Sequence, residues 1–470
     1  MELAPLKALF EFLYLIASVL FILGLKFLSS PARARQGNFV AAIGMAVATV
    51  TLLAQMYLDP TGPPVHNLPL ILLGIVLGAL FGAVGARRVA MTDMPQMVAI
   101  LNGCGGGSAA LISVGEFIHL SQDRAGADTL FGCIIGAISL TGSIVAFGKL
   151  QGIVSEKSVQ LPGGRFINAL LLVSLVGLTG WLALQGGGAP LFYALLVVSS
   201  LFGVLMVMPI GGADMPVVIS VLNSFTGLAV AATGFTLQNN ALIISGTLVG
   251  ASGTLLTMLM CKAMNRSIGN VMFAGFRPTV AAAAGAGGAG GSAKTHREVS
   301  VDDAAMLLAN VQSLIIVPGY GMAVAQAQHA VRELADLLAK KGVEVKYAIH
   351  PVAGRMPGHM NVLLAEANVP YDQLFDLDQI NADFERTDVA LVIGANDVVN
   401  PAARTDTTSP IYGMPILDAD KAQHVICIKR SMNPGFAGID NQLYYEPRTS
   451  MLFGDAKGAI VKLVEAVKAL

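Results

Sequence analysis

Nine long apolar runs follow one another through the first 261 residues, and no other feature restricts the possible folds as strongly. An α-helix needs roughly 17 to 25 apolar residues to cross the hydrocarbon core of a bilayer. Only 13% of the 470 residues are charged, against about 25% in a typical soluble protein. We therefore predict nine membrane-spanning helices and a lipid bilayer around them, near residues 8–28, 38–57, 68–86, 96–118, 129–148, 166–185, 189–209, 215–236 and 239–261.

Basic residues in the loops between the predicted spans give their orientation. They follow the first, third, fifth and ninth spans, at Lys26, Arg33, Arg35, Arg87, Arg88, Lys149, Lys157, Arg165, Lys262 and Arg266. Loops rich in Lys and Arg stay on the cytoplasmic side of a membrane. We therefore expect the N-terminus outside and the whole C-terminal region in the cytoplasm.

Charge and cysteine usage exclude several classes of function. The net charge is −1, and no basic run or aromatic ladder is present, so no nucleic-acid partner is expected. The four cysteines are scattered without metal-ligand spacing, so we predict neither a metal site nor a disulfide framework.

Polar side chains within or beside the apolar runs are candidates for a polar path, because each is costly in lipid unless it is paired. Asn102 and Asn223 lie at equivalent places, since each follows an Asp-Met-Pro sequence by the same distance. This internal similarity suggests two helices that face one another across such a path, and a simple hydrogen bond between the two asparagines is the alternative. Ser143 lies in the fifth span. Asp214 precedes the eighth span and is open to a second interpretation, as a helix cap.

Two stripes of glycine predict close approach between helices. Gly74, Gly78 and Gly82 recur every four residues, as do Gly246 and Gly250. Small residues at this spacing let neighbouring membrane helices pack tightly, so we assign these glycines to packing alone.

An Ala/Gly-rich stretch separates the apolar part from a more charged C-terminal part. We predict a membrane domain over 1–273, a flexible linker over 274–298, and a third region over 299–470. Aliphatic runs there alternate with helical periods, which predicts a Rossmann-like α/β domain with a doubly wound parallel sheet. Strands are expected at 312–317, 343–349, 388–393 and 424–429, and helices near 323–341, 359–368 and 455–469.

The first predicted strand runs into a glycine-rich turn. Gly319 and Gly321 follow the strand directly, and Val324 stands where a third glycine is usual. Such a turn lets the backbone approach a pyrophosphate, with free amides at the start of the following helix. The alternative is a turn that merely joins a strand to a helix. The glycine-rich turn also resembles part of a potassium-channel selectivity filter. Such a filter would lie between membrane helices, whereas this turn precedes a soluble amphipathic helix.

Polar residues follow the other predicted strands. Arg355 lies in the loop after the second strand as an anion clamp, and Gly394–Asn400 follows the third strand. Lys429, Arg430 and Ser431 end the fourth strand, where two cations and a hydroxyl suit a dianionic phosphate. Because no acidic residue ends the second strand, these residues favour NADP(H) over NAD(H). An ordinary solvated cationic turn is the alternative.

Several long segments match one known family. They are Met91–Gln96, Ser139–Lys149, Ile210–Val217, Cys261–Ser267, Gly319–Gln328, His350–Asp372, Ala395–Asp397, Lys429–Met432 and Met451–Lys457. On these segments the chain resembles, along its whole length, the β subunit of proton-translocating NAD(P) transhydrogenase.

The resemblance implies an activity and partners. Hydride passes directly between NADH and NADP+, coupled to inward proton movement across a bacterial-type plasma membrane. This chain would bind NADP(H), and a separate α subunit would bind NAD(H). Two αβ units would form a two-fold dimer. A nucleotide in this family lies reversed relative to the usual Rossmann pose, so the argument from the missing acidic residue loses force.

The resemblance also implies site residues. Nucleotide contacts are expected from Gly319, Tyr320, Gly321, Met322, Ala323, Arg355, Asn396, Asp397, Lys429, Arg430, Ser431 and Gly435. Asp397 would lie on the nicotinamide side, and Asp214, Asn223 and Ser143 would line the proton path. Two positions depart from the family pattern: Asn102 stands where many members have a titratable histidine, and Phe436 where many have tyrosine in a loop that covers the nucleotide.

Hydride transfer needs two nicotinamide rings in contact and no strong acid or base, so we expect the protein to position and to gate. Asp397 and Asp214 are the candidate titrating groups, and a structural role for either is the alternative. The rival function is an NADP(H)-sensing membrane transporter or channel. A purely structural membrane subunit would not explain the phosphate-binding residues.

Overall fold

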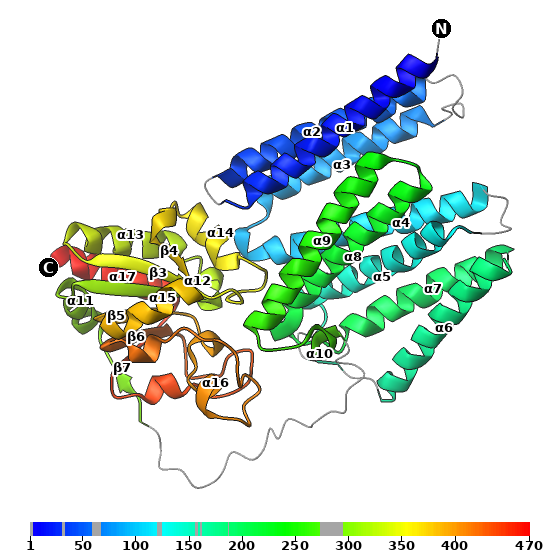
Figure 1. Ribbon diagram of the computed structural model, residues 1–470. Helices are drawn as coiled ribbons and strands as arrows, with labels where there is room; N and C mark the ends of the chain where they lie inside the picture. The colour runs from blue at the N-terminus through cyan, green and yellow to red at the C-terminus, as the bar shows by residue number, and fades with distance from the viewer. Residues whose placement is uncertain are drawn as a thin grey trace. The chain divides into compact units, whose positions relative to one another are not determined.

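The computed structural model describes residues 3–30, 33–58, 67–119, 125–155, 158–159, 162–186, 188–272 and 295–470 (Figure 1). The chain divides into two compact units. One comprises Met1–Ser155, Val159–Pro209 and Ile219–Leu255, and the other comprises Glu156–Ser158, Ile210–Val218 and Leu256–Leu470. Most of the predicted linker over 274–298 falls outside the described residues, which resume at 295.

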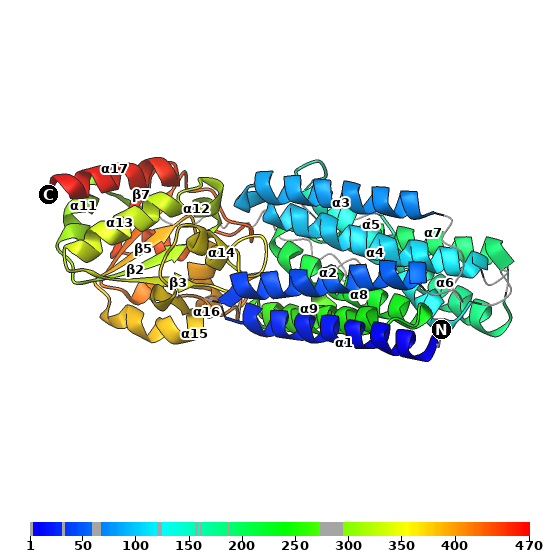
Figure 2. The same cartoon turned by 90° about the horizontal axis from the view of Figure 1, so that it is seen from above.

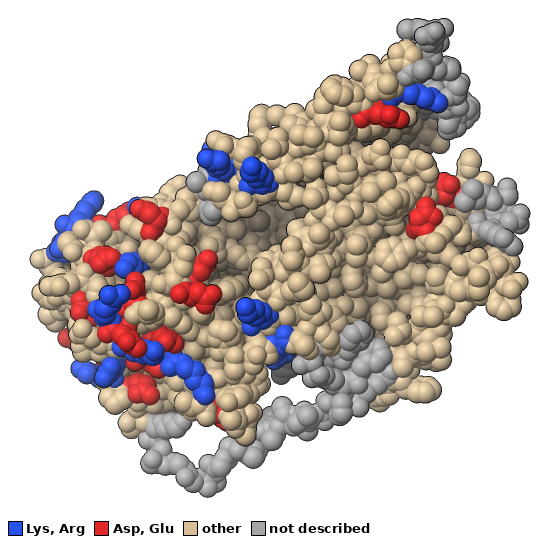
Figure 3. All heavy atoms as spheres, in the orientation of Figure 1, with Lys and Arg blue, Asp and Glu red and all other residues tan. Residues whose placement is uncertain are grey.

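The described part of the chain contains nine helices long and apolar enough to cross a membrane, which confirms the nine predicted runs. A helix satisfies all of its backbone hydrogen bonds within one segment, as lipid requires. On the face drawn in Figure 3, charged side chains are sparse over these helices and dense over the sheet. The helices are α1 (Leu3–Leu28), α2 (Ala34–Leu58), α3 (Leu68–Arg88), α4 (Met94–His119), α5 (Ala127–Leu150), α6 (Gly164–Leu184), α7 (Gly188–Val207), α8 (Met215–Thr236) and α9 (Asn240–Ala263).

The two glycine stripes have different surroundings. Gly246 lies against α8, where an added Cβ would meet the backbone of Gly227 and Ala231, so this stripe packs helices as predicted. At Gly74, Gly78 and Gly82 of α3 an added Cβ would meet nothing within 4 Å among the described residues. The same spacing therefore serves packing in α9, and in α3 no described neighbour uses it.

The internal similarity in the membrane part is one of local structure. A three-residue 3-10 turn, η2 (Met91–Asp93), precedes α4, and a second, η3 (Gly212–Asp214), precedes α8. In both cases the turn ends in Asp and the helix begins with Met-Pro. Proline is tolerated in the first turn of a helix because the N–H groups there lack intrahelical partners.

The second unit contains a seven-stranded, fully parallel sheet with the order β1-β7-β6-β5-β2-β3-β4. This confirms the predicted doubly wound α/β fold. All four predicted strands are present, and β1, β4 and β7 were missed. The strands are β1 (Arg297–Glu298), β2 (Ser313–Pro318), β3 (Glu344–Ile349), β4 (Leu374–Asp376), β5 (Val389–Ile393), β6 (His424–Lys429) and β7 (Thr449–Phe453).

Helices cover both faces of the sheet. On one face α11 (Val301–Ala309), α13 (Gln328–Lys340) and α17 (Ala456–Ala469) pack together, and α15 (Leu377–Ile380) lies on the other (Figure 2). The strand order reverses between β2 and β5, because the chain leaves β2 towards β3 and leaves β5 towards β6. Ligands of doubly wound sheets bind at such a switch point, beyond the carboxyl ends of the strands.

The helix predicted over 323–341 is wrong as one continuous element. The structure has a short α12 (Tyr320–Val324) and then α13, with Gln326 between them in the left-handed region at φ 49°. The N–H of Ala327 donates to the carbonyl oxygen of Met322, which closes the first helix. Glycine and asparagine are the residues that usually take the left-handed conformation, so a glutamine at this position gives no sign of a helix break in the sequence.

Candidate functional site

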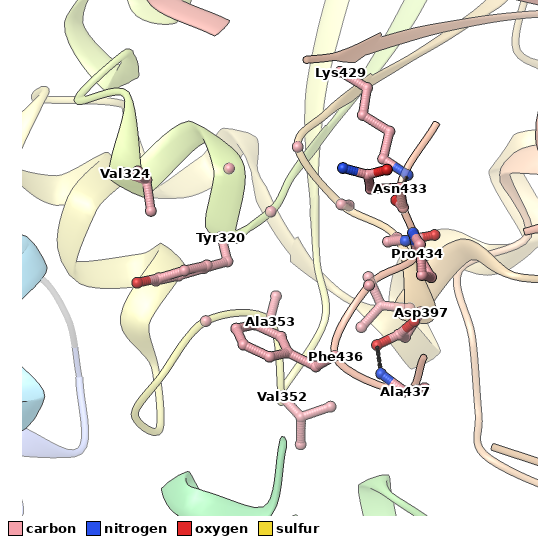
Figure 4. Close-up of a pocket in the computed structure, with 18 of the residues that line it drawn as sticks. Tyr320, Val324, Val352, Ala353, Asp397, Lys429, Asn433, Pro434, Phe436 and Ala437 are labelled. Carbon is pink, nitrogen blue, oxygen red and sulfur yellow. Dashed lines mark hydrogen bonds between the residues drawn. The ribbon is translucent and has the colours of Figure 1, made fainter. Parts of the chain in front are cut away.

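A cavity lies at the switch point, beyond the carboxyl ends of β2, β5 and β6 (Figure 4). Most of the predicted nucleotide contacts line it, although they come from three separate strands. Those that line it are Gly319, Tyr320, Gly321, Asn396, Asp397, Lys429, Arg430, Ser431 and Gly435. Three predicted contacts are not part of the lining: Met322 and Ala323, which are fully buried, and Arg355.

The glycines after β2 serve a close approach between two backbone turns. The N–H of Gly319 donates to the carbonyl oxygen of Ile393 (2.9 Å), and the N–H of Gly321 donates to that of Gly394 (2.9 Å). A Cβ at either glycine would collide with the backbone of Gly394 or Ala395. The expectation that these amides are free for a pyrophosphate is therefore corrected for Gly319 and Gly321, because the first donates to the last residue of β5 and the second to the turn that follows it.

An arginine and a phenylalanine pack against Tyr320, the first residue of α12. The guanidinium of Arg355 lies 4.6 Å from the centre of the Tyr320 ring, and the Phe436 ring lies 5.6 Å from Tyr320 on centroids. Phe436 is 46% exposed, and its ring contact with Tyr320 joins α12 to the loop over 433–438. The hydroxyl that tyrosine would bring to position 436 is not needed for it.

The polar side chains at the end of β6 differ in burial: Lys429 is partly buried, and Arg430 and Ser431 are exposed. Lys429 Nζ donates to the carbonyl oxygen of Asn433 (2.6 Å) and lies 4.6 Å over the Tyr444 ring. Burial lowers the pKa of Lys429, partly offset by the charge of Asp397. Arg430 and Ser431 are exposed and border the same cavity. A guanidinium and a hydroxyl, both groups that phosphates accept hydrogen bonds from, therefore line the same cavity.

Asp397 ties the loop over 433–438 to the end of β5. Its Oδ2 accepts the N–H of Ala437 at 3.0 Å (Figure 4). Burial raises the pKa of the Asp397 carboxyl, opposed by the backbone N–H groups of Ala437 and Phe436 and by the charge of Lys429. Its Oδ1 is buried and has no hydrogen-bond partner among the described residues.

The sequence did not single out His350, which holds the loop after β3. It is 2% exposed, its Nδ1 accepts the N–H of Val352 (3.2 Å), and its Nε2 lies 2.7 Å from the carbonyl oxygen of Pro415. Burial lowers the pKa of His350 to about 4, so the ring is neutral at neutral pH. An Nδ1 acceptor and an Nε2–H donor fit both partners, and the histidine joins two loops around the cavity.

The polar residues of the membrane part have separate surroundings. Asn102 Nδ2 donates to the carbonyl oxygen of Ile219 (3.3 Å), so α4 and α8 meet through a backbone contact instead of the alternative bond between Asn102 and Asn223. Asn223 is partly buried, and Ser143 is 1% exposed with an Oγ that has no partner in the described part of the chain.

Asp214 forms an ion pair. Its Oδ2 lies 2.6 Å from Arg266 Nη1, and the carboxyl is mostly buried. Burial raises the pKa of Asp214, and the charge of Arg266 opposes that shift. The described partner of this carboxylate is therefore a guanidinium, and its Oδ1 has no partner among the described residues.

Comparison with known proteins identifies the family. A sequence model described as NAD(P) transhydrogenase beta subunit matches residues 10–466. Two curated relatives, both named NAD(P) transhydrogenase subunit beta and both from Rhodospirillum rubrum, are 50% identical over 466 residues, covering 97% of this chain and 98% of theirs. The chain belongs to the NAD(P) transhydrogenase beta subunit family.

Membership of the NAD(P) transhydrogenase family confirms the predicted resemblance and makes the chain a subunit of an oxidoreductase. A β subunit implies an α subunit as its partner. The family binds NADP(H), and nine helices able to cross a membrane agree with a membrane enzyme.

Proposed function

We propose that this chain binds NADP(H) in the cavity at the switch point and exchanges hydride with NAD(H) held by the α subunit, with coupled inward movement of protons. The observation that carries the proposal is the end of β6, where Arg430 and Ser431 border the cavity and Lys429 lies beside them. Two cations and a hydroxyl at one strand end suit the dianionic 2′-phosphate that distinguishes NADP(H) from NAD(H).

The cavity has further features that fit a nucleotide. Asn396 and Asp397 both keep a buried polar atom without a partner in the described chain, and Phe436 packs on Tyr320 across the cavity mouth. Bound NADP+ supplies the nicotinamide ring that accepts the hydride. The chain's own residues then hold the phosphate, fix the ring and exclude water. Gly319, Tyr320 and Gly321 line the cavity, Met322 and Ala323 lie buried behind them, and Arg355 packs on Tyr320.

In this proposal, proton movement is coupled to nucleotide binding through the carboxyl groups of Asp397 and Asp214 and through polar residues of the spans. Asp397 contacts the loop over 433–438, so its protonation would change how that loop holds the nucleotide. Asp214, Asn223, Ser143 and Asn102 are the proposed proton path. Binding free energies are reciprocal, so the redox state of the nucleotide must change proton affinity by the same coupling energy.

The proposed arrangement places residues 1–273 in a bacterial-type plasma membrane with the N-terminus outside. A linker over 274–298 would then lead to a cytoplasmic NADP(H) domain over 299–470. Two αβ units would form a two-fold dimer. The positive residues that follow the odd-numbered spans support this orientation.

The deciding experiment uses membrane vesicles that contain this chain and its α subunit. Hydride transfer from NADPH to an NAD+ analogue is followed with and without a protonophore. We expect transfer that requires the α subunit and accelerates when the proton gradient collapses. Transfer that ignores the protonophore would contradict the coupling, and NADPH binding without transfer would favour an NADP(H)-sensing transporter.

A further inference from the structure

The hairpin of α4 and α5 has a counterpart in the hairpin of α8 and α9. In both, a 3-10 turn ends in Asp, the first helix begins with Met-Pro, and an asparagine, Asn102 or Asn223, follows at the same distance. An α8 residue therefore corresponds to the α4 residue 121 positions earlier in the chain, as Asp214 corresponds to Asp93.

The second helices of the two hairpins pack in the same register. A Cβ at Gly136 of α5 would meet the backbone of Gly106 and Ala110 in α4. A Cβ at Gly246 of α9 would meet the backbone of the two α8 residues that correspond to Gly106 and Ala110. Gly246 is therefore the counterpart of Gly136, and an α9 residue corresponds to the α5 residue 110 positions earlier.

A glycine–serine pair further along the helices follows this register. A Cβ at Gly103 of α4 would lie 3.3 Å from the Cβ of Ser143 in α5. At the corresponding positions a Cβ at Gly253 of α9 would lie 3.1 Å from the Cβ of Ser224 in α8. The small and the larger residue have exchanged helices and still face one another. The two hairpins are therefore repeats of one structural unit, as in many membrane transport proteins.

In the first repeat, the second helix is covered on two sides. α5 lies between α4 and α7 (Figure 1). The hydroxyl of Thr141 lies 2.9 Å from the carbonyl oxygen of Ser200 in α7, and a Cβ at Gly203 of α7 would meet the backbone of α5. Residues that follow the spacing i, i+3, i+4 and i+7 share one side of a helix. The side of α5 that faces α7 consists of Ile138, Thr141, Gly142 and Val145.

In the second repeat, the same side of the helix is open. It consists of Leu248, Ala251, Ser252 and Leu255, which we call the open side of α9. Ala251, Ser252 and Leu255 are exposed, the last at 57%, and Leu248 is partly exposed. Their α5 counterparts are buried, or partly buried at Thr141. In the most apolar stretches of the two helices, 61% of the residues are buried in α5 and 22% in α9.

The open side has the properties of a helix–helix contact. Ala251 and Ser252 are small and adjacent, as Thr141 and Gly142 are where α7 packs. Small residues let membrane helices approach closely, and lipid has no need of them. None of the four side chains is charged, so the occupant must be uncharged and apolar where it touches α9. The β-subunit family implies an α subunit as the partner of this chain.

We propose that the open side of α9 binds a membrane-spanning helix of the α subunit, in the way that α7 packs on α5 in the other repeat. The α subunit then completes the second repeat, which the described part of this chain leaves with one neighbour fewer than the first. The contact needs no nucleotide, so it goes beyond the proposed function.

The test measures whether the α subunit covers position 252. Ser252→Cys is a conservative change at an exposed position, so the chain should fold as before. The variant is reacted with a small maleimide in mild detergent, alone and in complex with the α subunit, and modification of residue 252 is followed by mass spectrometry. Thiol reactivity depends on access, so we expect labelling about tenfold slower in the complex.

Ala169→Cys is the matched control. Ala169 is an exposed residue of α6, in the same unit and in a span of similar hydropathy. Its labelling rate should be the same with and without the α subunit. A second variant, Ala251→Leu, enlarges a small residue of the open side, so less α subunit should copurify with the tagged chain, whereas Ala169→Leu should leave that amount unchanged.

Three results would overturn the proposal. Equal labelling at 252 with and without the α subunit would mean that lipid or detergent covers the open side. Protection that appears in the chain alone as its concentration rises would assign this side to a second copy. Equal protection at 169 would mean that the α subunit slows labelling everywhere. If Ser252→Cys does not fold, unchanged copurification of the α subunit with Ala251→Leu overturns the proposal in its place.

Discussion

Thr141 in the helical unit and Asn396 in the sheet unit both join two elements through a polar side chain, with different outcomes. The Thr141 hydroxyl lies within hydrogen-bond distance of the carbonyl oxygens of Ala137 in α5 (3.0 Å) and Ser200 in α7 (2.9 Å), so its single proton is shared between its own helix and the contact with α7. The side-chain oxygen of Asn396 accepts hydrogen bonds from Asn441 and from Tyr444 of η9 (Gln442–Tyr445), and its buried Nδ2 has no partner among the described residues. The hydrogen-bonding capacity of Thr141 is used within the fold, whereas Asn396 lines the cavity and leaves one polar atom unpaired among the described residues.

Arg430→Ala should give the largest effect, and it acts on binding without acting on stability. The guanidinium is exposed and no described side chain pairs with it, so its loss leaves no buried group unpaired. A hydrogen bond to a charged group contributes roughly 1.5–3 kcal/mol, so we expect NADPH to bind about 10- to 100-fold more weakly. Binding of NADH, which lacks the 2′-phosphate, should change little.

Equilibrium dialysis of both nucleotides measures this difference. Arg404→Ala is a suitable control, because Arg404 is a surface arginine of the same unit whose partners are Asp418 and Asp420. An equal loss of NADPH and NADH affinity in Arg430→Ala would mean that this residue does not hold the 2′-phosphate.

Gly246→Leu should have the opposite effect to Arg430→Ala: it should lower the stability of the helical unit and leave nucleotide binding in the cavity unchanged. The added side chain meets the backbone of α8, and overpacking of this kind costs typically 1–3 kcal/mol. Gly78→Leu adds the same atoms where nothing described lies within 4 Å. Thermal unfolding of the helical unit in detergent should therefore show a lower transition temperature for the first variant only. Equal destabilisation by both would mean that α3 packs against a partner through its glycine stripe.

Some features of both units could be predicted from the sequence, and others could not. The apolar runs predicted nine spans because length and hydropathy are local properties, and the strand runs predicted the parallel sheet for the same reason. The sequence placed Lys429, Arg430 and Ser431 at the end of a strand, and all three line the cavity, while their role as an anion site stays a prediction. The break between α12 and α13 was not, because Gln326 takes a left-handed conformation without a glycine.

Tertiary contacts account for the rest of the site. Asn441 and Asn396 are separated by 45 residues and meet only because η9 folds back onto the end of β5. No spacing rule links them. The amides of Gly319 and Gly321 donate to the end of β5 and to the turn after it, and a linear glycine motif contains no information on those partners.

Thr141→Val tests how much the Thr141 hydroxyl stabilises the helical unit, and a small effect is expected. Valine matches threonine in shape and removes only the hydroxyl, so one hydrogen bond between α5 and α7 is lost. Such bonds within membrane proteins average about 0.6 kcal/mol. We expect a slightly lower transition temperature in detergent with an unchanged Kd for NADPH. A change in NADPH affinity as large as that of Arg430→Ala would break the distinction between the two regions.

Asp397→Asn should give the smallest effect on stability, and one that depends on pH. Burial raises the pKa of this carboxyl above its value of about 3.9 in the unfolded chain. The protonated form therefore favours the folded state, and its contribution is complete below the unfolded pKa and declines as the pH rises through the folded pKa. Asparagine is neutral throughout and keeps an oxygen that can accept the N–H of Ala437.

Relative to the unaltered chain, the asparagine variant should gain stability as the pH rises above that of the unfolded carboxyl, and the difference should vanish in acid. Denaturant unfolding of the full chain at several pH values, in the absence of nucleotide, measures this. NADPH release from the unaltered chain should depend on pH over the same range, and this dependence should weaken in the variant. A variant whose stability difference is constant across pH would show that Asp397 does not titrate there, and it would remove this carboxyl from the proposed coupling.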